Sequence, residues 1–311
     1  MNQRVFFPSL LFVLCCLLIS MLSACPQEAQ PPADTASEQR PLRMGFIPSE
    51  NMAEIQRNAQ PLVDQLSAAL GQEVQAFIAN DYTGVVEAFR NDKLDFAFLS
   101  PASYVMAQRE ADVRVILRTQ RGEAPFYHAV IFTHKDSGIT SLAQLKGKTF
   151  AFGDNLSTAG YIFPLKMLRA AGLNPDTDFE NMLFSGSHDA TVFAVHNQKV
   201  TAGATYANDP KGDDAAWKHM LKPEQAADIR VLSVSEPIPA DNLCVHPKLD
   251  AALVEKISAF FLALENEASG RELMHNLYHI DRFVPASDAD YAGVREAFAE
   301  AGIQMQQKAP Q

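Results

Sequence analysis

Short apolar runs rich in β-forming residues alternate with longer segments of helical periodicity from residue 43 onward. The run 43–48 predicts a strand, and the segment from Met52 to Leu70 predicts a helix that ends at Gly71. The same patterns predict strands at 74–79, 95–99, 113–119, 128–133, 148–152, 202–206 and 229–235, and helices at 82–91, 101–109, 157–171, 188–197, 248–267, 270–277 and 291–301. Strands separated by helices are typical of mostly parallel sheets flanked by helices, with ligand-facing loops at the C-terminal ends of the strands.

The alternation is interrupted at 135–138, and a second series of strands and helices begins at Leu142. After residue 239 the pattern is almost entirely helical, so we expect this tail to pack on the first series. The chain is therefore expected to be an α/β protein with two lobes, made of residues 42–132 with 237–311, and of residues 133–236. Crossings near 131–136 and 234–239 would form a two-strand hinge, and a hinge between two such lobes makes a cleft that can close.

The N-terminal residues determine the expected compartment. Arg4 supplies a short positive segment, an apolar run extends from Leu10 to Met21, and small residues precede Cys25. The run is shorter than the roughly 20 residues that cross a bilayer as a helix, so 1–24 predicts a cleaved signal peptide, with a single-span anchor as the alternative. Residues 25–41 are polar and proline-rich and predict a flexible tether.

The segment from Leu22 to Cys25 resembles the lipobox of bacterial lipoproteins, in which the cysteine is lipidated and becomes the new N-terminus. This resemblance implies lipidation at Cys25 and a protein anchored to the periplasmic face of a membrane. Because Cys15 and Cys16 leave with the signal peptide, Cys244 is the cysteine that remains, and no disulfide framework is expected.

The composition argues against a broad basic surface. The 311 residues include 37 acidic and 26 basic side chains, which give a formal net charge of -11. No nucleic-acid partner is therefore expected, because such a partner is held by many phosphate contacts. A small anion can still be bound locally by oriented N–H groups and hydroxyls, whereas a long polyanion responds to the charge of the whole surface.

The segment from Gly153 to Tyr161 contains a candidate anion site. A strand is expected to end at Phe152, and a helix to begin in the run Ser157-Thr158-Ala159-Gly160. Free N–H groups in a first helical turn and the helix dipole favour an anion there, and the two hydroxyls add donors. Ser and Thr also suit plain helix capping, so the pattern leaves both interpretations open.

Further candidates lie near the ends of expected strands. His188 begins an expected helix and could donate to an oxyanion, with a surface histidine as the alternative. Tyr82 and Tyr127 lie at strand ends, where a tyrosine either binds a ligand or packs half-buried. Asp241 follows the second crossing, and taken alone it is typical of a loop cap.

Motifs for catalysis, metals and cofactors are weak. The run 146–149 resembles the end of a phosphate-binding P-loop, but Leu142 stands where the first glycine belongs, and the segment precedes a strand. His275 and His279 share a helix face, yet the glutamate of the corresponding metal motif is absent. No catalytic residue, metal ion or cofactor is therefore expected.

These features together resemble the PhnD family, the periplasmic phosphate-, phosphite- and phosphonate-binding proteins of ABC importers, which have the type II periplasmic-binding fold. The resemblance runs from about Arg43 to about Phe283. It rests on the segments 45–50, 81–88, 101–104, 134–139, 142–148, 155–161, 195–203 and 237–239. Each segment is weak alone, but their joint occurrence in this order is specific.

The resemblance implies a ligand site built from both lobes. The residues that it implicates are Tyr82, Ser100, Tyr127, Ser157, Thr158, Ala159, His188 and Asp241, with Ala159 contributing its backbone N–H. Ala159 stands where the family often has a hydroxyl, and Ser100 where it often has glycine. An aminophosphonate binder would place a carboxylate near residues 206–209, which makes Asn208 and Asp209 further candidates, and no Arg or Lys is expected in the site.

The implied function is that of a lipid-anchored, monomeric solute-binding protein of an ABC importer. It would capture phosphonate, phosphite or phosphate, a small anionic phosphorus ligand, by hinge closure and deliver it to a membrane permease. The alternative is an oxyanion-sensing lipoprotein that signals to a membrane kinase, since a sensor needs the same closing cleft. The sequence does not rank the possible oxyanions.

Overall fold

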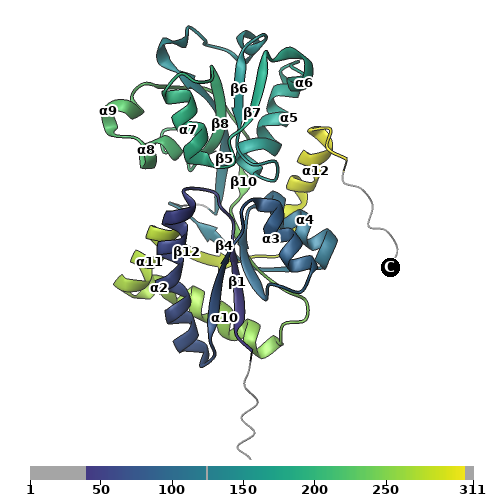
Figure 1. The fold of residues 1–311 in the computed structure, drawn as a ribbon, viewed down its shortest axis with the longest axis vertical. Helices are drawn as coiled ribbons and strands as arrows, with labels where there is room; N and C mark the ends of the chain where they lie inside the picture. The colour runs from purple at the N-terminus through teal and green to yellow at the C-terminus, as the bar shows by residue number, and fades with distance from the viewer. Residues whose placement is uncertain (1–39, 124, 305–311) are drawn as a thin grey trace, which may run out of the picture. The chain divides into compact units, whose positions relative to one another are not determined.

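Two six-stranded sheets organise the computed structural model, which describes residues 40–123 and 125–304 (Figure 1). The first sheet contains β1 (Leu42–Phe46), β2 (Val74–Ile78), β3 (Phe96–Leu99), β4 (Arg114–Gln120), β11 (Asn242–Val245) and β12 (Arg282–Pro285). Its strand order is β12-β4-β11-β3-β1-β2. The second sheet contains β5 (Phe126–His134), β6 (Thr149–Phe152), β7 (Asn181–Phe184), β8 (Ala202–Ala207), β9 (Ile229–Val234) and β10 (Ile238–Pro239). Its order is β10-β5-β8-β6-β7, with β9 paired to β5 outside this path.

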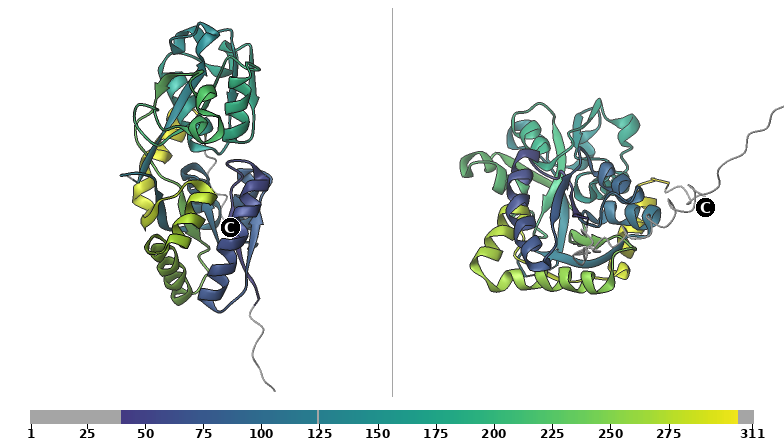
Figure 2. Two further views of the ribbon diagram at one scale, coloured as in Figure 1. Left: turned by 90° about the vertical axis from the view of Figure 1, so that its left-hand side faces the viewer. Right: turned by 60° about the horizontal axis from the view of Figure 1, so that its bottom comes forward.

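Helices connect the strands and cover the sheets. They are α2 (Met52–Leu70), α3 (Tyr82–Arg90), α4 (Pro101–Ala111), α5 (Phe163–Ala170), α6 (Pro175–Asp178), α7 (His188–His196), α8 (Ala216–Met220), α9 (Pro223–Ala226), α10 (Ala251–Ala263), α11 (Ala268–Tyr278) and α12 (Ala292–Glu300). Short helical turns are η1 (Lys135–Ser137), η2 (Leu142–Leu145), the π-helical turn η3 (Thr158–Ile162), η4 (Leu264–Asn266) and η5 (Asp288–Tyr291). The side view in Figure 2 shows the elements of the second sheet above those of the first.

Helix α2 shows how the sequence fixes an element. The side chain of Asn51 accepts hydrogen bonds from the N–H groups of Ala53 and Glu54 and so caps the helix start. Apolar residues at helical spacing, including Leu62 and Leu66, are buried in the core of the first sheet. Gly71 ends the helix at φ 65°, a left-handed conformation that favours glycine.

The predicted two-sheet α/β architecture is confirmed, and the sheets are mixed. Strand β1 pairs in parallel with β2 and β3, and β6 pairs in parallel with β7 and β8. Strand β11 is antiparallel to β3 and β4, and β5 is antiparallel to β8 and β9. The antiparallel pairs arise where the chain passes from one sheet to the other. Strands β11 and β12 lie in the tail that the sequence predicts as helical, and at four residues each they are too short to show a clear periodicity.

The chain passes between the sheets twice. Strand β5 pairs along its whole length within the second sheet, so the first passage lies between Gln120 and Phe126. The return lies between Pro239 and Asn242. The first crossing was expected at 131–136. Judged by which sheet each strand belongs to, it lies earlier in the chain, because the continuous nine-residue strand β5 already belongs to the second sheet there. The lobe boundaries themselves stay a prediction.

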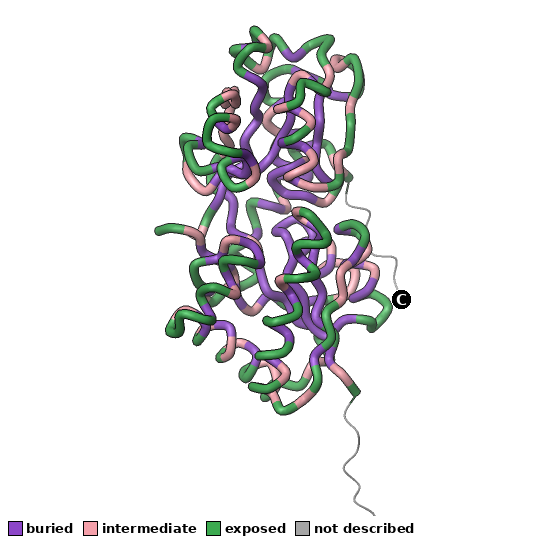
Figure 3. The backbone as a smooth tube through the Cα atoms, turned by 60° about the vertical axis from the view of Figure 1, so that its left-hand side comes forward, coloured by how far each residue is buried: buried purple, intermediate pink, exposed green. Residues whose placement is uncertain are grey.

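The C-terminal helix α12 contacts elements of both sheets. It packs against α4, which follows a strand of the first sheet, and against α5, which belongs to the second (Figure 1). Lys166 of α5 forms ion pairs with Glu300 of α12 and with Glu236. In Figure 3 the buried residues lie mainly in the interior of the molecule, and the exposed residues lie mainly on its outer turns.

The predicted signal peptide, the lipidation at Cys25 and most of the tether fall on residues 1–39, outside the residues that the structure describes. Within the described ranges, no helix combines the length and the apolar character that a membrane span requires.

Candidate functional site

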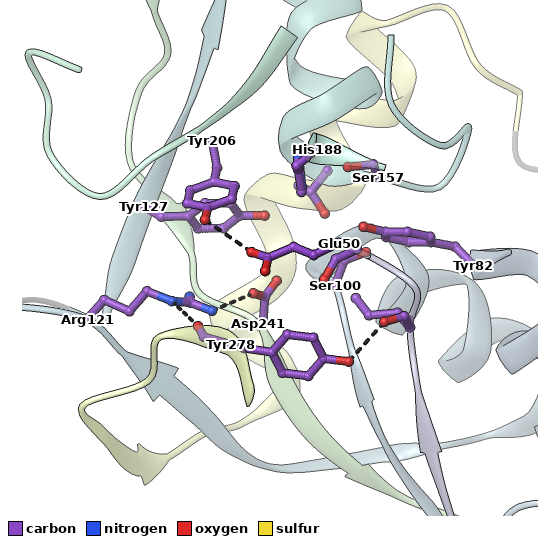
Figure 4. Close-up of a pocket in the computed structure, with 13 residues that line it drawn as sticks. Glu50, Tyr82, Ser100, Arg121, Tyr127, Ser157, His188, Tyr206, Asp241 and Tyr278 are labelled. Atoms are coloured by element: carbon purple, nitrogen blue, oxygen red, sulfur yellow. Dashed lines mark hydrogen bonds and ion pairs between the residues drawn. The ribbon is translucent and has the colours of Figure 1, made fainter. Parts of the chain in front are cut away.

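A cavity lies where loops from both sheets meet, and it contains about 440 Å³ of space including its open mouth (Figure 4). Its lining residues are Ile47, Ser49, Glu50, Tyr82, Ser100, Arg121, Tyr127, Ser157, Thr158, His188, Tyr206, Asp241 and Tyr278. Most of them are polar or charged. The cavity therefore suits a small polar ligand.

Strand ends place most of these side chains. Glu50, Tyr82 and Ser100 follow β1, β2 and β3 of the first sheet. Ser157 and His188 follow β6 and β7 of the second sheet. The five strands belong to the parallel parts of their sheets, whose C-terminal ends are where open α/β folds bind ligands.

The turn after β6 is built around Ser157. Its hydroxyl accepts a 3.0 Å hydrogen bond from the N–H of Gly160 and so caps the π-helical turn η3. A Cβ at position 160 would lie 2.7 Å from the Ser157 oxygen, so only glycine fits there. The N–H of Gly153 donates to the carbonyl of Gly160 at 3.0 Å, which fixes the turn against the end of β6.

Hydrogen bonds around the cavity join the two halves of the molecule, namely the half built on the first sheet and the half built on the second. The hydroxyl of Thr158 accepts a 2.8 Å bond from the N–H of Ala102, in the first turn of α4. The hydroxyl of Ser100 donates to the carbonyl of Leu156 at 3.0 Å and also caps α4. The N–H of His188 donates to the carbonyl of Ser49 at 2.9 Å. These bonds keep the N-terminal ends of helices from both halves next to the same cavity.

The cavity contains a cation, contrary to the expectation of a site without Arg or Lys. Arg121 lies directly after β4, and its Nη2 is 3.3 Å from Oδ2 of Asp241. Its Nε donates to the carbonyl of Tyr278 at 3.0 Å. Burial raises the pKa of Asp241, and the charge of Arg121 opposes this rise. The pair thus allows a carboxylate to stay ionised inside the cavity.

Glu50 adds a second carboxylate. The hydroxyl of Tyr206 donates to Glu50 Oε1 at 3.3 Å. Burial raises the pKa of Glu50 to about 7, while Arg121 and Tyr206 act in the opposite direction. In Figure 4 the carboxylates of Glu50 and Asp241 lie close together and point toward each other. At neutral pH Glu50 is therefore ionised in some molecules and protonated in others.

His188 is a neutral side chain of the site. Burial, with a smaller contribution from Arg121, lowers its pKa to about 4. Its Nδ1 lies 2.9 Å from the hydroxyl oxygen of Thr205, which leaves Nε2 as the ring nitrogen for a ligand. Burial also raises the pKa of the Tyr82 and Tyr127 phenols well above the usual value. Both phenols therefore stay protonated and can donate hydrogen bonds.

The structure brings seven of the eight predicted site residues to the cavity lining. They are Tyr82, Ser100, Tyr127, Ser157, Thr158, His188 and Asp241. Ala159 is not among the lining residues, and its side chain is buried in an apolar core. The expected contact is through its backbone N–H in η3, and this stays a prediction. Asn208 and Asp209 do not line the cavity either, since the Asp209 carboxylate accepts bonds from the N–H groups of Lys211 and Asp214 in its own loop.

Sequence reasoning missed six of the lining residues, of which Ile47 and Ser49 lie close before Glu50 in the chain, and the other four carry ionisable groups. These four are Glu50, Arg121, Tyr206 and Tyr278. Glu50 ends a segment that contributed to the family resemblance, so its position after β1 was a usable signal. Arg121 and Tyr278 come from a strand end and a helix end that meet only in the fold, and no local motif marks them.

Comparisons with known proteins agree with this geometry. The model of the family described as "ABC transporter, phosphonate, periplasmic substrate-binding protein" matches residues 44–291. The chain is 28% identical to the phosphonates-binding periplasmic protein of Escherichia coli over 236 residues, which cover 74% of this chain and 68% of the relative. It is 27% identical to the phosphate-import protein PhnD of Mycolicibacterium smegmatis over 299 residues, covering 89% and 91%.

A crystal structure of a binding protein component of an ABC phosphonate transporter from Pseudomonas aeruginosa superimposes with a TM-score of 0.76 at 26% identity, covering 85% of this chain and 87% of that one. A tetrathionate sensor histidine kinase of Salmonella typhimurium is 31% identical over 164 residues, which are 51% of this chain and 28% of the kinase. The predicted type II periplasmic-binding fold is confirmed, and the chain belongs to the family of periplasmic phosphonate substrate-binding proteins of ABC transporters.

Proposed function

We propose that the cavity captures a phosphonate, phosphite or phosphate ion, and that the protein delivers this ion to an ABC permease in the membrane. The observation that carries the proposal is the convergence of donors from both sheets. Ser157, Thr158 and His188 come from the second sheet, and Tyr82 follows β2 of the first. A tetrahedral oxyanion offers acceptors in several directions at once, which matches donors that surround a small cavity.

The two carboxylates in the cavity favour a ligand that carries a proton. Asp241 and ionised Glu50 can only accept hydrogen bonds, so they disfavour a fully ionised oxygen beside them. A monoprotonated phosphorus oxyanion can donate its proton to one carboxylate while its other oxygens accept from the hydroxyls. Sulfate has no proton to donate at neutral pH, and we expect the site to reject it.

The hydrogen bonds between the two halves support ligand capture by hinge closure. The pairs Thr158–Ala102 and Ser100–Leu156 each join residues that follow strands of different sheets. They form only when the halves are together. A ligand that contacts both halves stabilises this arrangement over an open one, because it binds the two states with different affinity.

The lipid anchor is part of the proposal. We infer that Cys25 is lipidated and that the residues before Arg40 tether the binding unit to the periplasmic face of a membrane. A Cys25→Ser variant in cells should then leave the membrane fraction and appear as soluble periplasmic protein. Retention in the membrane fraction would contradict lipidation at this residue.

A sensor role is the second candidate function. Its support is the similarity of about half of this chain to part of a sensor histidine kinase. Crosslinking in cells followed by mass spectrometry separates the two roles, since a permease partner supports transport and a kinase partner supports sensing.

The central test is a thermal-shift panel on protein lacking residues 1–25. The panel contains phosphate, phosphite, methylphosphonate, 2-aminoethylphosphonate, sulfate and arsenate. A ligand at a hundred times its Kd stabilises the folded protein by about 2.7 kcal/mol, which raises Tm visibly. We expect at least one phosphorus oxyanion to raise Tm and sulfate to leave it unchanged. A panel in which no phosphorus compound raises Tm would contradict the proposal.

A further inference from the structure

A second group of polar side chains lies in the part of the molecule built on the second sheet, away from the cavity. His134 is the last residue of β5, His196 is the last residue of α7, and Asp228 immediately precedes β9. One potential ligand atom from each lies within 4.8 Å of the others. None of the three lines the cavity described above. We propose that His134, His196 and Asp228 form a site for a divalent transition-metal ion of the zinc type.

His196 supplies the first argument. Its Nδ1 is buried and has no hydrogen-bond partner among the described residues. A buried polar atom without a partner is unfavourable, and native structures contain few of them. Coordination of an ion by the His196 ring would give this side chain a partner that the protein itself does not provide.

The ligand set supplies the second argument. Two imidazoles and one carboxylate are a donor set that suits Zn²⁺ and its neighbours Co²⁺, Ni²⁺ and Cu²⁺. Ca²⁺ and Mg²⁺ prefer oxygen ligands throughout. Because three protein ligands are present, we expect water to complete the coordination of the ion. Side chains whose ligand atoms are up to 4.8 Å apart need only a small inward movement to bind one ion.

His134 has a neighbour of the kind that orients metal-bound histidines. Its Nδ1 lies 3.7 Å from Oδ2 of Asp136 and accepts a 3.2 Å hydrogen bond from the N–H of the same residue. An ion on Nε2 requires the ring proton to move to Nδ1. This breaks the hydrogen bond from the Asp136 N–H, and after a small approach Nδ1 can donate to the Asp136 carboxylate instead. Such carboxylate–histidine–metal arrangements hold the ring in place and raise its basicity.

Lys135 competes with the ion. Its Nζ lies 2.6 Å from Oδ1 of Asp228, and this contact lowers the pKa of the carboxyl group. The Lys135 side chain is 46% exposed, so it can turn toward solvent when an ion arrives. Metal binding must break this ion pair, which limits the affinity. We therefore expect that removing the Lys135 amino group strengthens metal binding.

The test is calorimetric titration of ZnCl₂ into the chelator-treated protein in a buffer free of phosphate. We expect one-to-one saturable binding, at least tenfold weaker binding for His196→Ala, and several-fold tighter binding for Lys135→Met. The matched control is His275→Ala, which removes a histidine from the separate group His219, His275 and His279 and should leave the affinity unchanged. Co²⁺ absorption spectra provide a second readout.

Two results would overturn the metal site. One is the absence of saturable zinc binding to the unaltered protein, and the other is an unchanged affinity in His196→Ala. If His196→Ala does not fold, Asp228→Asn makes the same comparison, because it removes the carboxylate and keeps its shape. The titration requires no phosphorus ligand, so its outcome is independent of the function proposed for the cavity.

Discussion

The hydroxyl oxygen of Thr158 accepts a 2.8 Å hydrogen bond from the backbone N–H of Ala102. Thr158 begins η3 after a strand of the second sheet, and Ala102 lies in the first turn of α4 after a strand of the first. A hydroxyl has one proton to donate, and accepting a bond from Ala102 leaves that proton for another partner. Thr158 can therefore bridge the two halves and bind a ligand oxygen at the same time.

Thr158→Val should weaken oxyanion binding by about tenfold to more than a hundredfold. Valine has nearly the same shape but no hydroxyl, so a hydrogen bond to a charged oxygen worth roughly 1.5–3 kcal/mol is lost. Calorimetry with the best ligand from the thermal-shift panel measures the change. The matched control is Thr177→Val, at an exposed threonine on the same half of the molecule, which should bind normally. An unchanged affinity for Thr158→Val would remove this hydroxyl from the site.

Arg121→Met should destabilise the protein and do so most at neutral pH. The change leaves Asp241 largely buried without the cation that opposes its rise in pKa. Loss of the charged hydrogen bonds of Arg121 should lower the free energy of unfolding by roughly 1.5–3 kcal/mol. Acid reduces the loss, because a protonated Asp241 needs no cation. Urea unfolding at two pH values measures this difference.

The double variant Arg121→Met with Asp241→Asn is the control for this pair. It removes both charges, so much of the lost stability should return. A double variant that is as unstable as the sum of the two single variants would show that the residues act independently.

The sequence was sufficient to predict the turn after β6 that brings Ser157 and Thr158 to the cavity, because its signals are local. A strand, a capping Ser157 and an obligatory Gly160 follow one another within a few residues. Tyr82 was predictable for the same reason, since it follows the strand β2 and begins α3. Strands β5, β6, β8 and β9 of the second sheet were likewise visible in the periodicity, whereas the short strands β7 and β10 were not.

Contacts between distant segments were not predictable in this way. Arg121 reaches the cavity only because β4 of the first sheet ends beside Asp241, which lies 120 residues further along. The short strand β11 enters the first sheet between β3 and β4, and four residues contain too little pattern to reveal such a partner. Ala159 has its side chain in the core, so only its backbone N–H, which the family resemblance implicates, is left as a possible ligand contact.

Glu50 should make stability fall as pH rises from about 4.5 to 7. Burial raises the pKa of Glu50 to about 7 in the folded protein, so the folded state binds more protons than the unfolded state in this window. The shift corresponds to at most roughly 3 kcal/mol. His188 contributes to the pH dependence with the opposite sign. The free energy of unfolding is therefore measured against pH for the unaltered protein and for Glu50→Gln, and the difference between the two curves reports on Glu50.

The control for this pH dependence is Glu255→Gln, at an exposed carboxylate of α10. Its stability profile should parallel that of the unaltered protein. Parallel profiles for Glu50→Gln and the unaltered protein would instead show that Glu50 does not titrate as described. An anionic ligand should raise the pKa of Glu50 further, so that binding near neutral pH takes up a proton.

His279 should make the folded protein sensitive to acid. Its ring stacks on that of His219 with centroids 4.5 Å apart. His279 follows α11, which packs against α2 of the first half, and His219 lies in α8 of the second half. Burial, with contributions from His219 and His275, lowers the pKa of His279 to about 4. The folded state therefore excludes a proton that the unfolded state binds, and stability should fall as pH decreases from about 6.5 to 4. His279→Asn removes the ionisable ring and suits the left-handed backbone at φ 53°, so its Tm should decrease less in acid. Thermal melts of both proteins across this pH range measure the effect, and equal acid sensitivity in the two would show that the stacked histidines do not couple protonation to stability.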